Sequence, residues 1–136
     1  MAHNNKAFND LLKKLFSFIG FVFLLVFLSQ PCLSKHLNTE RDYQEKWCDE
    51  NGGQVEVTMP DKTRCDCLTG EYAVEFDFGE KWAEAIGQSL YYALQTNKKA
   101  GIGLIIEQSK DYKYWLRLNS TIMHHNLPIR TWIIKP

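Results

Sequence analysis

YAVEFDFGEKW, residues 72–82, joins a β-strand to the start of a helix with no loop between them. Apolar side chains alternate with small or acidic ones from residue 72 to residue 78, which is the pattern of a strand whose two faces differ. One face carries only Tyr, Val and Phe, while the other carries the acids Glu75 and Asp77. Gly79 ends the alternation, so the strand is expected to end there.

Strand and helix patterns surround this segment in a regular order. The expected elements are a helix from Thr39 to the residue before Asn51, strands at 55–58, 63–68 and 72–78, a helix at 80–97, a strand at 102–106, a helix at 111–118 and a strand at 129–134. The stripe of helix 80–97 expected to be buried consists of Trp82, Ile86, Leu90, Ala93 and Leu94. This order predicts an α/β domain with a mixed sheet flanked by helices.

The composition is that of one small folded domain. The chain has 136 residues, of which 45% are hydrophobic and 24% are charged. This apolar content excludes a disordered chain. Lys and Arg number 16, and Asp and Glu also number 16, so a strongly basic nucleic-acid coat is excluded. Residues 35–136 alone carry 13 basic and 15 acidic side chains, a formal net charge of −2.

The first 34 residues have the layout of an export signal. Lys13 and Lys14 precede an apolar run of 14 residues from Leu15 to Leu28, and a polar segment with Pro31 follows. The run is short for a membrane span of about 20 residues. We therefore expect residues 1–34 to be a signal peptide, with an uncleaved N-terminal membrane anchor as the alternative. In both cases residues 35–136 form one domain outside the cytoplasm, periplasmic or secreted, and no stable membrane span is expected after cleavage.

Three cysteines fall within this exported domain: Cys48, Cys65 and Cys67. In an oxidising compartment one disulfide is expected, with one thiol left over. Cys48 is expected to pair with Cys65 or with Cys67, and the closed loop would stabilise the fold by about 3 kcal/mol. A metal site on Cys-Asp-Cys lacks the second, spaced pair of ligands that such sites use.

Three acids are expected to lie close together on neighbouring strands. A hairpin that turns at residues 69–71 brings Asp66 beside Glu75 and Asp77. Converging carboxylates repel one another unless a cation lies between them, and Mg²⁺ prefers such oxygen ligands. The alternative is that all three acids are solvated on an open face of the sheet.

These residues resemble the PD-(D/E)xK nuclease superfamily, which has the restriction-endonuclease-like fold. The resemblance consists of Asp66, then Glu75 on an alternating strand that runs into a helix. Residues 88–92, Gln-Ser-Leu-Tyr-Tyr, are similar to the Gln-x-x-x-Tyr motif of the exonuclease branch. The expected order of residues 40–106 is similar to the α-β-β-β-α-β core of that superfamily.

The resemblance implies a role for each matching residue. Asp66 and Glu75 would bind a divalent metal, Mg²⁺ or Mn²⁺, and Gln88 and Tyr92 would point from the helix toward the site. Some members use an extra acid from the first helix, which here is Glu40 or Glu45.

One position departs from the superfamily pattern. Asp77 stands where the superfamily has a catalytic Lys, and it would add ligand charge or contact a second metal ion. Lys81, about one helical turn beyond the strand, is the expected substitute for the missing Lys.

The resemblance implies an exported, metal-dependent nuclease that hydrolyses phosphodiester bonds of nucleic acid. The alternative is a catalytically inactive binding or structural protein of the cell envelope on the same fold. Asp77 in the Lys position and the net negative charge favour this alternative. Another aromatic group, Tyr112, Tyr114 and Trp115, is interpreted either as core or as a surface that stacks on a base or a sugar.

Overall fold

The structure is a computed structural model that describes residues 36–136. The signal peptide or anchor predicted at residues 1–34 lies outside the described residues. The elements, in chain order, are α2 (Glu40–Glu50), β1 (Gln54–Thr58), β2 (Arg64–Leu68), β3 (Tyr72–Phe78), the 3₁₀ turn η1 (Gly79–Lys81), α3 (Trp82–Thr96), β4 (Lys99–Ile105), the 3₁₀ turn η2 (Ser109–Asp111), α4 (Tyr112–His124) and β5 (Ile129–Ile134).

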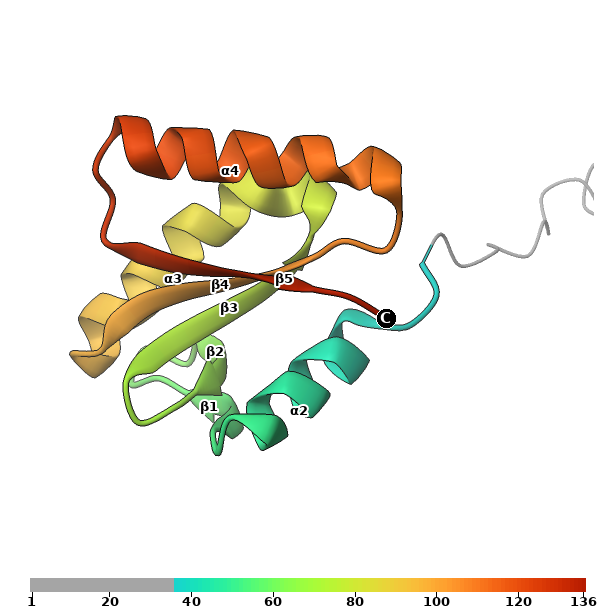
Figure 1. The fold of residues 1–136 in the computed structure, drawn as a ribbon. Coiled ribbons are helices and arrows are strands. Elements are labelled where there is room, and N and C mark those ends of the chain that lie inside the picture. Colours follow the sequence, from blue (N-terminus) through green and yellow to red (C-terminus); the bar gives the residue numbers. More distant parts are fainter. Residues whose placement is uncertain (1–35) are drawn as a thin grey trace, which may run out of the picture. The chain divides into compact units, whose positions relative to one another are not determined.

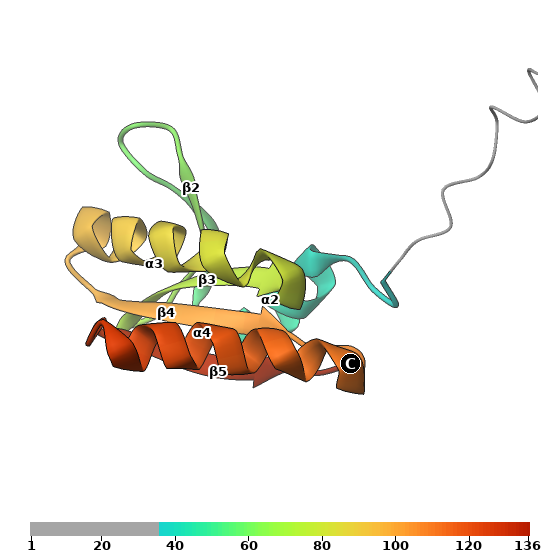
Figure 2. The same ribbon diagram turned by 90° about the horizontal axis from the view of Figure 1, so that it is seen from above.

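The five strands form one mixed sheet in the order β1-β2-β3-β4-β5. β1, β2 and β3 are antiparallel neighbours, while β3, β4 and β5 are parallel. Figure 1 shows α3 and α4 on one face of the sheet and α2 on the other, and Figure 2 shows α3 and α4 side by side. The predicted α/β class with a mixed sheet flanked by helices is confirmed.

The alternation in β3 places its two faces in different surroundings. Val74 and Phe76 pack with Tyr43 and Trp47 of α2. On the opposite face, β4 and β5 pack beneath α3 and α4, with Leu118 of α4 fully buried there. Both faces of the central strands are therefore covered, as is usual for the parallel part of a sheet.

Two glycines of β4 make room for large rings on the α2 face. A Cβ atom at Gly103 would lie 2.5 Å from the Phe76 ring, and one at Gly101 would lie 2.8 Å from the Trp132 ring. These aromatic rings lie directly over the β4 backbone, so a side chain at either glycine would displace them.

A disulfide between Cys48 and Cys67 joins the end of α2 to β2. Of the two predicted pairings, the structure has the one that closes the longer loop, with a sequence separation of 19. Cys65 is free and fully buried. The disulfide agrees with the predicted oxidising compartment.

The segment before α2 is fixed by one buried acid at the end of β4. Glu107 accepts hydrogen bonds from the Tyr43 hydroxyl at 2.7 Å, from the Leu37 backbone at 3.0 Å and from His36 Nδ1 at 3.0 Å. Thr39 then caps α2 in a capping box with Asp42.

The predicted buried face of α3 was wrong in part. The buried residues of this helix are Ala85, Ser89 and Tyr92, whereas Leu94 is 77% exposed. Small side chains at Ala85 and Ser89 let the helix pack closely on the sheet. Trp82 and Ile86 instead pack on the flank of the helix, in the core shared with α4.

Two element boundaries differ from the prediction by three residues or more, and the others differ by two or fewer. β4 begins at Lys99 instead of residue 102, because the Gly-containing start of this strand pairs with β3 throughout. α4 extends to His124 instead of residue 118, because Leu118 and Ile122 bury the same side of the helix one turn apart. Within residues 36–136, no helix has both the length and the apolar character needed to cross a membrane.

Candidate functional site

The sheet splits between β2 and β3, and the acids predicted to share a site lie at this split. β2 pairs with β3 only through residues 67–68 and 73–74, whereas β4 pairs with β3 along its full length. Beyond the split, Asp66 Oδ2 accepts a hydrogen bond from the Phe76 backbone N–H at 2.8 Å. At this point a hydrogen bond to the Asp66 side chain therefore replaces a backbone hydrogen bond between β2 and β3.

Glu75 and Asp77 point to the α3 face of the sheet and are buried, with 5% and 3% exposed. Their neighbours in β4, Ile102 and Leu104, lie in the apolar core of that face. Glu75 Oε2 and Asp77 Oδ2 have no hydrogen-bond partner among the described residues. The alternative of three solvated acids on an open face is therefore wrong.

Burial raises the pKa of all three carboxyls, and the charges of neighbouring acids add to this effect. Burial is the main cause for Glu75, and the charges of Asp66 and Asp77 add to it, so that its pKa reaches about 9. Burial raises the pKa of Asp77 to about 7, against the opposing effect of Lys81. Burial also raises the pKa of Asp66 to about 6, although its bond to the backbone opposes this. We call Asp66, Glu75 and Asp77 the acid cluster.

Lys81 reaches the acid cluster from the 3₁₀ turn η1. Its Nζ lies 3.2 Å from Asp77 Oδ1 and 3.6 Å from Glu40 Oε2 at the start of α2. The hydrogen bond to Asp77 raises the pKa of Lys81, so its ammonium is charged. Of the two acids predicted as candidates on the first helix, Glu40 joins the site, whereas Glu45 pairs with Arg41 on the exposed side.

Tyr92 is buried, whereas Gln88 lies on the exposed side of α3. Tyr92 packs with Met59, Cys65 and Ala73. Burial raises the pKa of the Tyr92 hydroxyl, and the charge of Glu75 adds to this effect. The structure therefore buries one member of the predicted Gln-x-x-x-Tyr pair, and the role of both residues at the site stays a prediction.

A second group of residues on the α2 side was missed from the sequence. Gln44 is buried and donates from Nε2 to the Asp66 carbonyl at 2.6 Å and to Glu56 Oε1 at 3.0 Å. Glu56 has φ +56° and pairs with Arg64. In the β1–β2 hairpin the residues flanking Glu56 pair with those flanking Asp66. This register is the signal that could have identified Glu56 as a neighbour of Asp66.

The acid cluster has the chemistry of a cation site but not the arrangement of one. Within residues 36–136, no three His, Cys, Asp or Glu side chains are placed to hold one metal ion. Asp66 bonds to the backbone and Asp77 to Lys81, so both would have to turn. The two buried oxygens with no partner, one on Glu75 and one on Asp77, are the donors that a hard divalent cation prefers. The predicted metal ligands therefore have suitable donor atoms, and metal binding stays a prediction.

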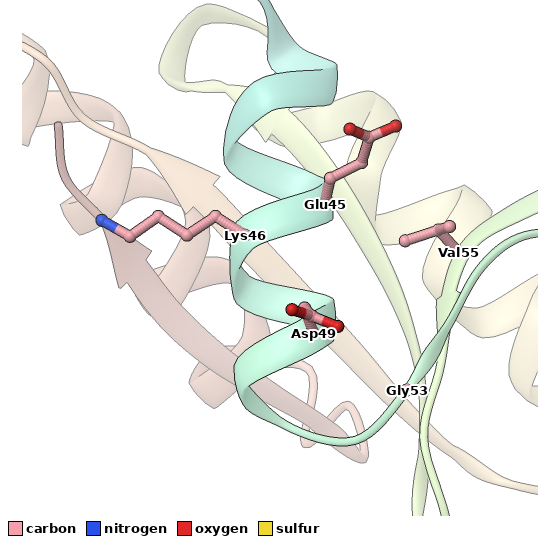
Figure 3. Close-up of a pocket in the computed structure, with 5 residues that line it drawn as sticks. All are labelled: Glu45, Lys46, Asp49, Gly53 and Val55. Atoms are coloured by element: carbon pink, nitrogen blue, oxygen red, sulfur yellow. The ribbon is translucent and has the colours of Figure 1, made fainter.

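An open hollow of about 430 Å³ lies elsewhere, between α2 and β1. Glu45, Asp49 and Val55 are among the residues that line it, and Figure 3 shows the two acids on the helix with Val55 across from them. The acid cluster does not line this hollow.

Comparisons of the chain with family models, with curated proteins and with solved structures gave no match.

Proposed function

We propose that this chain is a divalent-metal-dependent nuclease that hydrolyses phosphodiester bonds of nucleic acid outside the cytoplasm. The observation that carries the proposal is the acid cluster, in which two buried carboxyl groups each have an oxygen without a hydrogen-bond partner among residues 36–136. Burying carboxyl groups that repel one another costs stability unless a proton or a cation neutralises them. Such an arrangement is typical of sites that bind a ligand rather than of structural acids.

The order of elements supports a restriction-endonuclease-like core. α2, β1, β2, β3, α3 and β4 follow one another as helix, three strands, helix and strand. β3 carries Glu75 and runs into α3 through η1, and β2 carries Asp66 at the split. This is the arrangement on which the resemblance to the PD-(D/E)xK superfamily rests.

In the proposed mechanism Asp66, Glu75 and Asp77 would hold the ion, which when bound would supply a more acidic water and stabilise negative charge on the phosphate. Lys81, held at the edge of the cluster by Asp77 and Glu40, contacts a phosphate oxygen or orients the water. Lys81 lies four residues beyond Asp77 in the sequence and contacts its carboxyl group. It can therefore replace the Lys that this chain lacks within the strand.

A second candidate is a protein that has lost catalysis. The contacts of Lys81 with Asp77 and Glu40 favour it, because an ammonium in this place already neutralises part of the negative charge. In this case the acid cluster would have a structural role or bind a partner, and cleavage of nucleic acid is not expected.

The test is a cleavage assay on protein that was exported into an oxidising compartment, so that the disulfide is formed. Supercoiled, linear and single-stranded DNA and RNA are incubated with Mn²⁺, Mg²⁺ or EDTA. Glu75→Gln is the inactive variant, and Glu50→Gln, at an exposed position on α2, is the matched control. Lys81→Gln separates catalysis from metal binding.

Metal-dependent cleavage that is lost in Glu75→Gln and kept in Glu50→Gln supports the nuclease. Lys81→Gln is expected to lower cleavage at least 100-fold, the usual effect of removing one such electrostatic contact. The same variant should keep any rise in melting temperature that Mn²⁺ causes in the wild type. Equal background cleavage in all four proteins would favour the non-catalytic candidate.

A further inference from the structure

Basic and acidic residues are distributed unevenly along the chain of the domain. Residues 108–136 carry five basic side chains and one acid, Asp111. Residues 36–107 carry seven basic and fourteen acidic side chains. Helix α4 itself contains no acid and makes up much of the basic part. A net negative domain therefore has one element whose charge suits a polyanion.

Two exposed stripes run side by side along α4. The first, which we call the basic stripe, consists of Lys113, Arg117 and His124, all exposed and spaced four and seven residues apart. The second, which we call the apolar stripe, consists of Tyr112, Leu116 and Met123, which are 40%, 64% and 76% exposed.

The apolar stripe faces the β5 side of the molecule. Asn119, which lies between Leu116 and Met123 on this side of the helix, accepts a hydrogen bond from the Thr131 hydroxyl of β5 at 3.0 Å. Leu118 and Ile122 fill the core on a third side. Apolar side chains of this size normally cover a core or a ligand when they form a row.

The basic stripe begins where α4 packs on the turn η1. Lys113 Nζ lies 4.8 Å from the centre of the Tyr114 ring, and Arg117 Cζ lies 5.6 Å from it. The Tyr114 ring packs on Gly79, where a Cβ atom would lie 2.9 Å from Tyr114 Cδ2. Gly79 begins η1, the same turn that carries Lys81 to Asp77, so the start of the stripe is anchored on the turn that serves the proposed catalytic site.

We propose that α4 binds single-stranded nucleic acid, with phosphates on the basic stripe and unstacked bases on the apolar stripe. A single strand presents both a charged backbone and apolar base faces, and proteins bind it through basic surfaces beside aromatic side chains. In a duplex the base faces are stacked on one another, so they cannot contact the apolar stripe. The proposal rests on the proposed function for its choice of substrate, but binding can be measured without cleavage.

An anionic membrane is the other polyanion that a basic, amphipathic helix can bind. The observations favour nucleic acid over it for two reasons. Polar Asn119 and Ser120 interrupt the apolar stripe, so it does not form a continuous surface for insertion. The basic stripe also begins where α4 packs on η1, the turn that carries Lys81 to the acid cluster of the proposed phosphodiester site.

The test measures binding in EDTA, so that no metal-dependent cleavage takes place. The probes are a labelled single-stranded oligonucleotide, the same sequence as a duplex, and phosphatidylglycerol vesicles, each over a range of salt concentrations. The variant is Lys113→Gln with Arg117→Gln. The matched control is Lys46→Gln with Lys62→Gln, which removes the same charge from exposed positions on α2 and on the β1–β2 turn.

The wild type is expected to bind the single strand more tightly than the duplex, and the α4 variant about ten-fold or more weakly. Each lost phosphate contact on a single strand lowers the slope of log K against log salt by about 0.7, so the double variant should lose about 1.4. For Arg117→Gln alone, the slope of log K against log salt should fall by half of this amount, about 0.7. The control pair should bind like the wild type, and all variants should keep the wild-type melting temperature, because the four side chains are exposed.

Equal binding by the α4 variant and the control pair would overturn the proposal, as would tighter binding of duplex or binding of vesicles alone. The proposed function can fail separately. Binding that depends on α4, without metal-dependent cleavage, would refute the nuclease and leave the docking surface. Cleavage that does not depend on Lys113 and Arg117 would support the nuclease and refute the docking surface on α4.

Discussion

Replacing Glu75 with Gln should make the domain more stable at alkaline pH. Glu75 is buried, and its pKa of about 9 means that it keeps a proton at neutral pH. Gln has nearly the same shape as a protonated Glu and does not ionise. The variant should therefore match the wild type only at about pH 4 and below, and exceed it in stability by a growing margin as the pH rises toward 9.

The size of this effect follows from proton linkage. A Glu carboxyl in an unfolded chain has a pKa near 4.3, so between that value and about 9 the folded protein holds a proton that the unfolded chain has released. The free energy of unfolding then falls by about 1.4 kcal/mol for each pH unit. From pH 6 to pH 8 this single group removes about 3 kcal/mol from the wild type. For a domain of this size that is about 12 °C or more in melting temperature.

The assay is thermal unfolding at pH 6 and pH 8 in EDTA, for the wild type, Glu75→Gln and the exposed control Glu50→Gln. The other acids titrate in all three proteins, so the difference between the curves isolates Glu75. Parallel curves for wild type and Glu75→Gln would refute the reasoning, because they would mean that Glu75 is ionised in the folded protein. Adding Mn²⁺ at pH 8 should raise the wild-type melting temperature and leave that of Glu75→Gln unchanged.

Three further predictions concern the rest of the domain. Cys65 should not react with a thiol reagent in the native protein and should react after denaturation, because it is fully buried and burial raises its pKa to about 12. Reduction of Cys48–Cys67 should lower the free energy of unfolding by about 3 kcal/mol, measured in denaturant with and without reductant; no change would contradict its role as a cross-link. Gly103→Ala should cost about 1–3 kcal/mol because its methyl group overlaps the Phe76 ring, and an unchanged denaturation midpoint would show that the ring can move aside.

The faces of the central strand could be predicted from the sequence because alternation is a local property. Val74 and Phe76 lie on one side and Glu75 and Asp77 on the other, as expected. The burial of the two acids was not predictable in the same way. It depends on β2 leaving β3 after two residue pairs and on α3 packing over the exposed edge, which are both long-range features.

The acids of the site were found more easily than the residues around them. Asp66, Glu75 and Asp77 stand on predicted neighbouring strands, and Lys81 follows within a helical turn. Glu56 was missed because nothing in an alternating Val-Glu-Val segment distinguishes an acid that faces Asp66 from one that faces solvent. On α3 the close packing of Ala85 and Ser89 changed which side was buried. A pattern of large apolar residues cannot predict this, because small residues carry the contact.

The split in the sheet divides the acid cluster between two strands that separate beyond two residue pairs. Asp66 belongs to the β1–β2 hairpin, which the disulfide fastens to α2, whereas Glu75 and Asp77 belong to β3 and the parallel part of the sheet. The amide of Phe76 donates across this boundary to the Asp66 carboxylate. Its hydrogen-exchange rate therefore reports whether Asp66 keeps this hydrogen bond, and a cation that drew Asp66 away would free that amide to exchange.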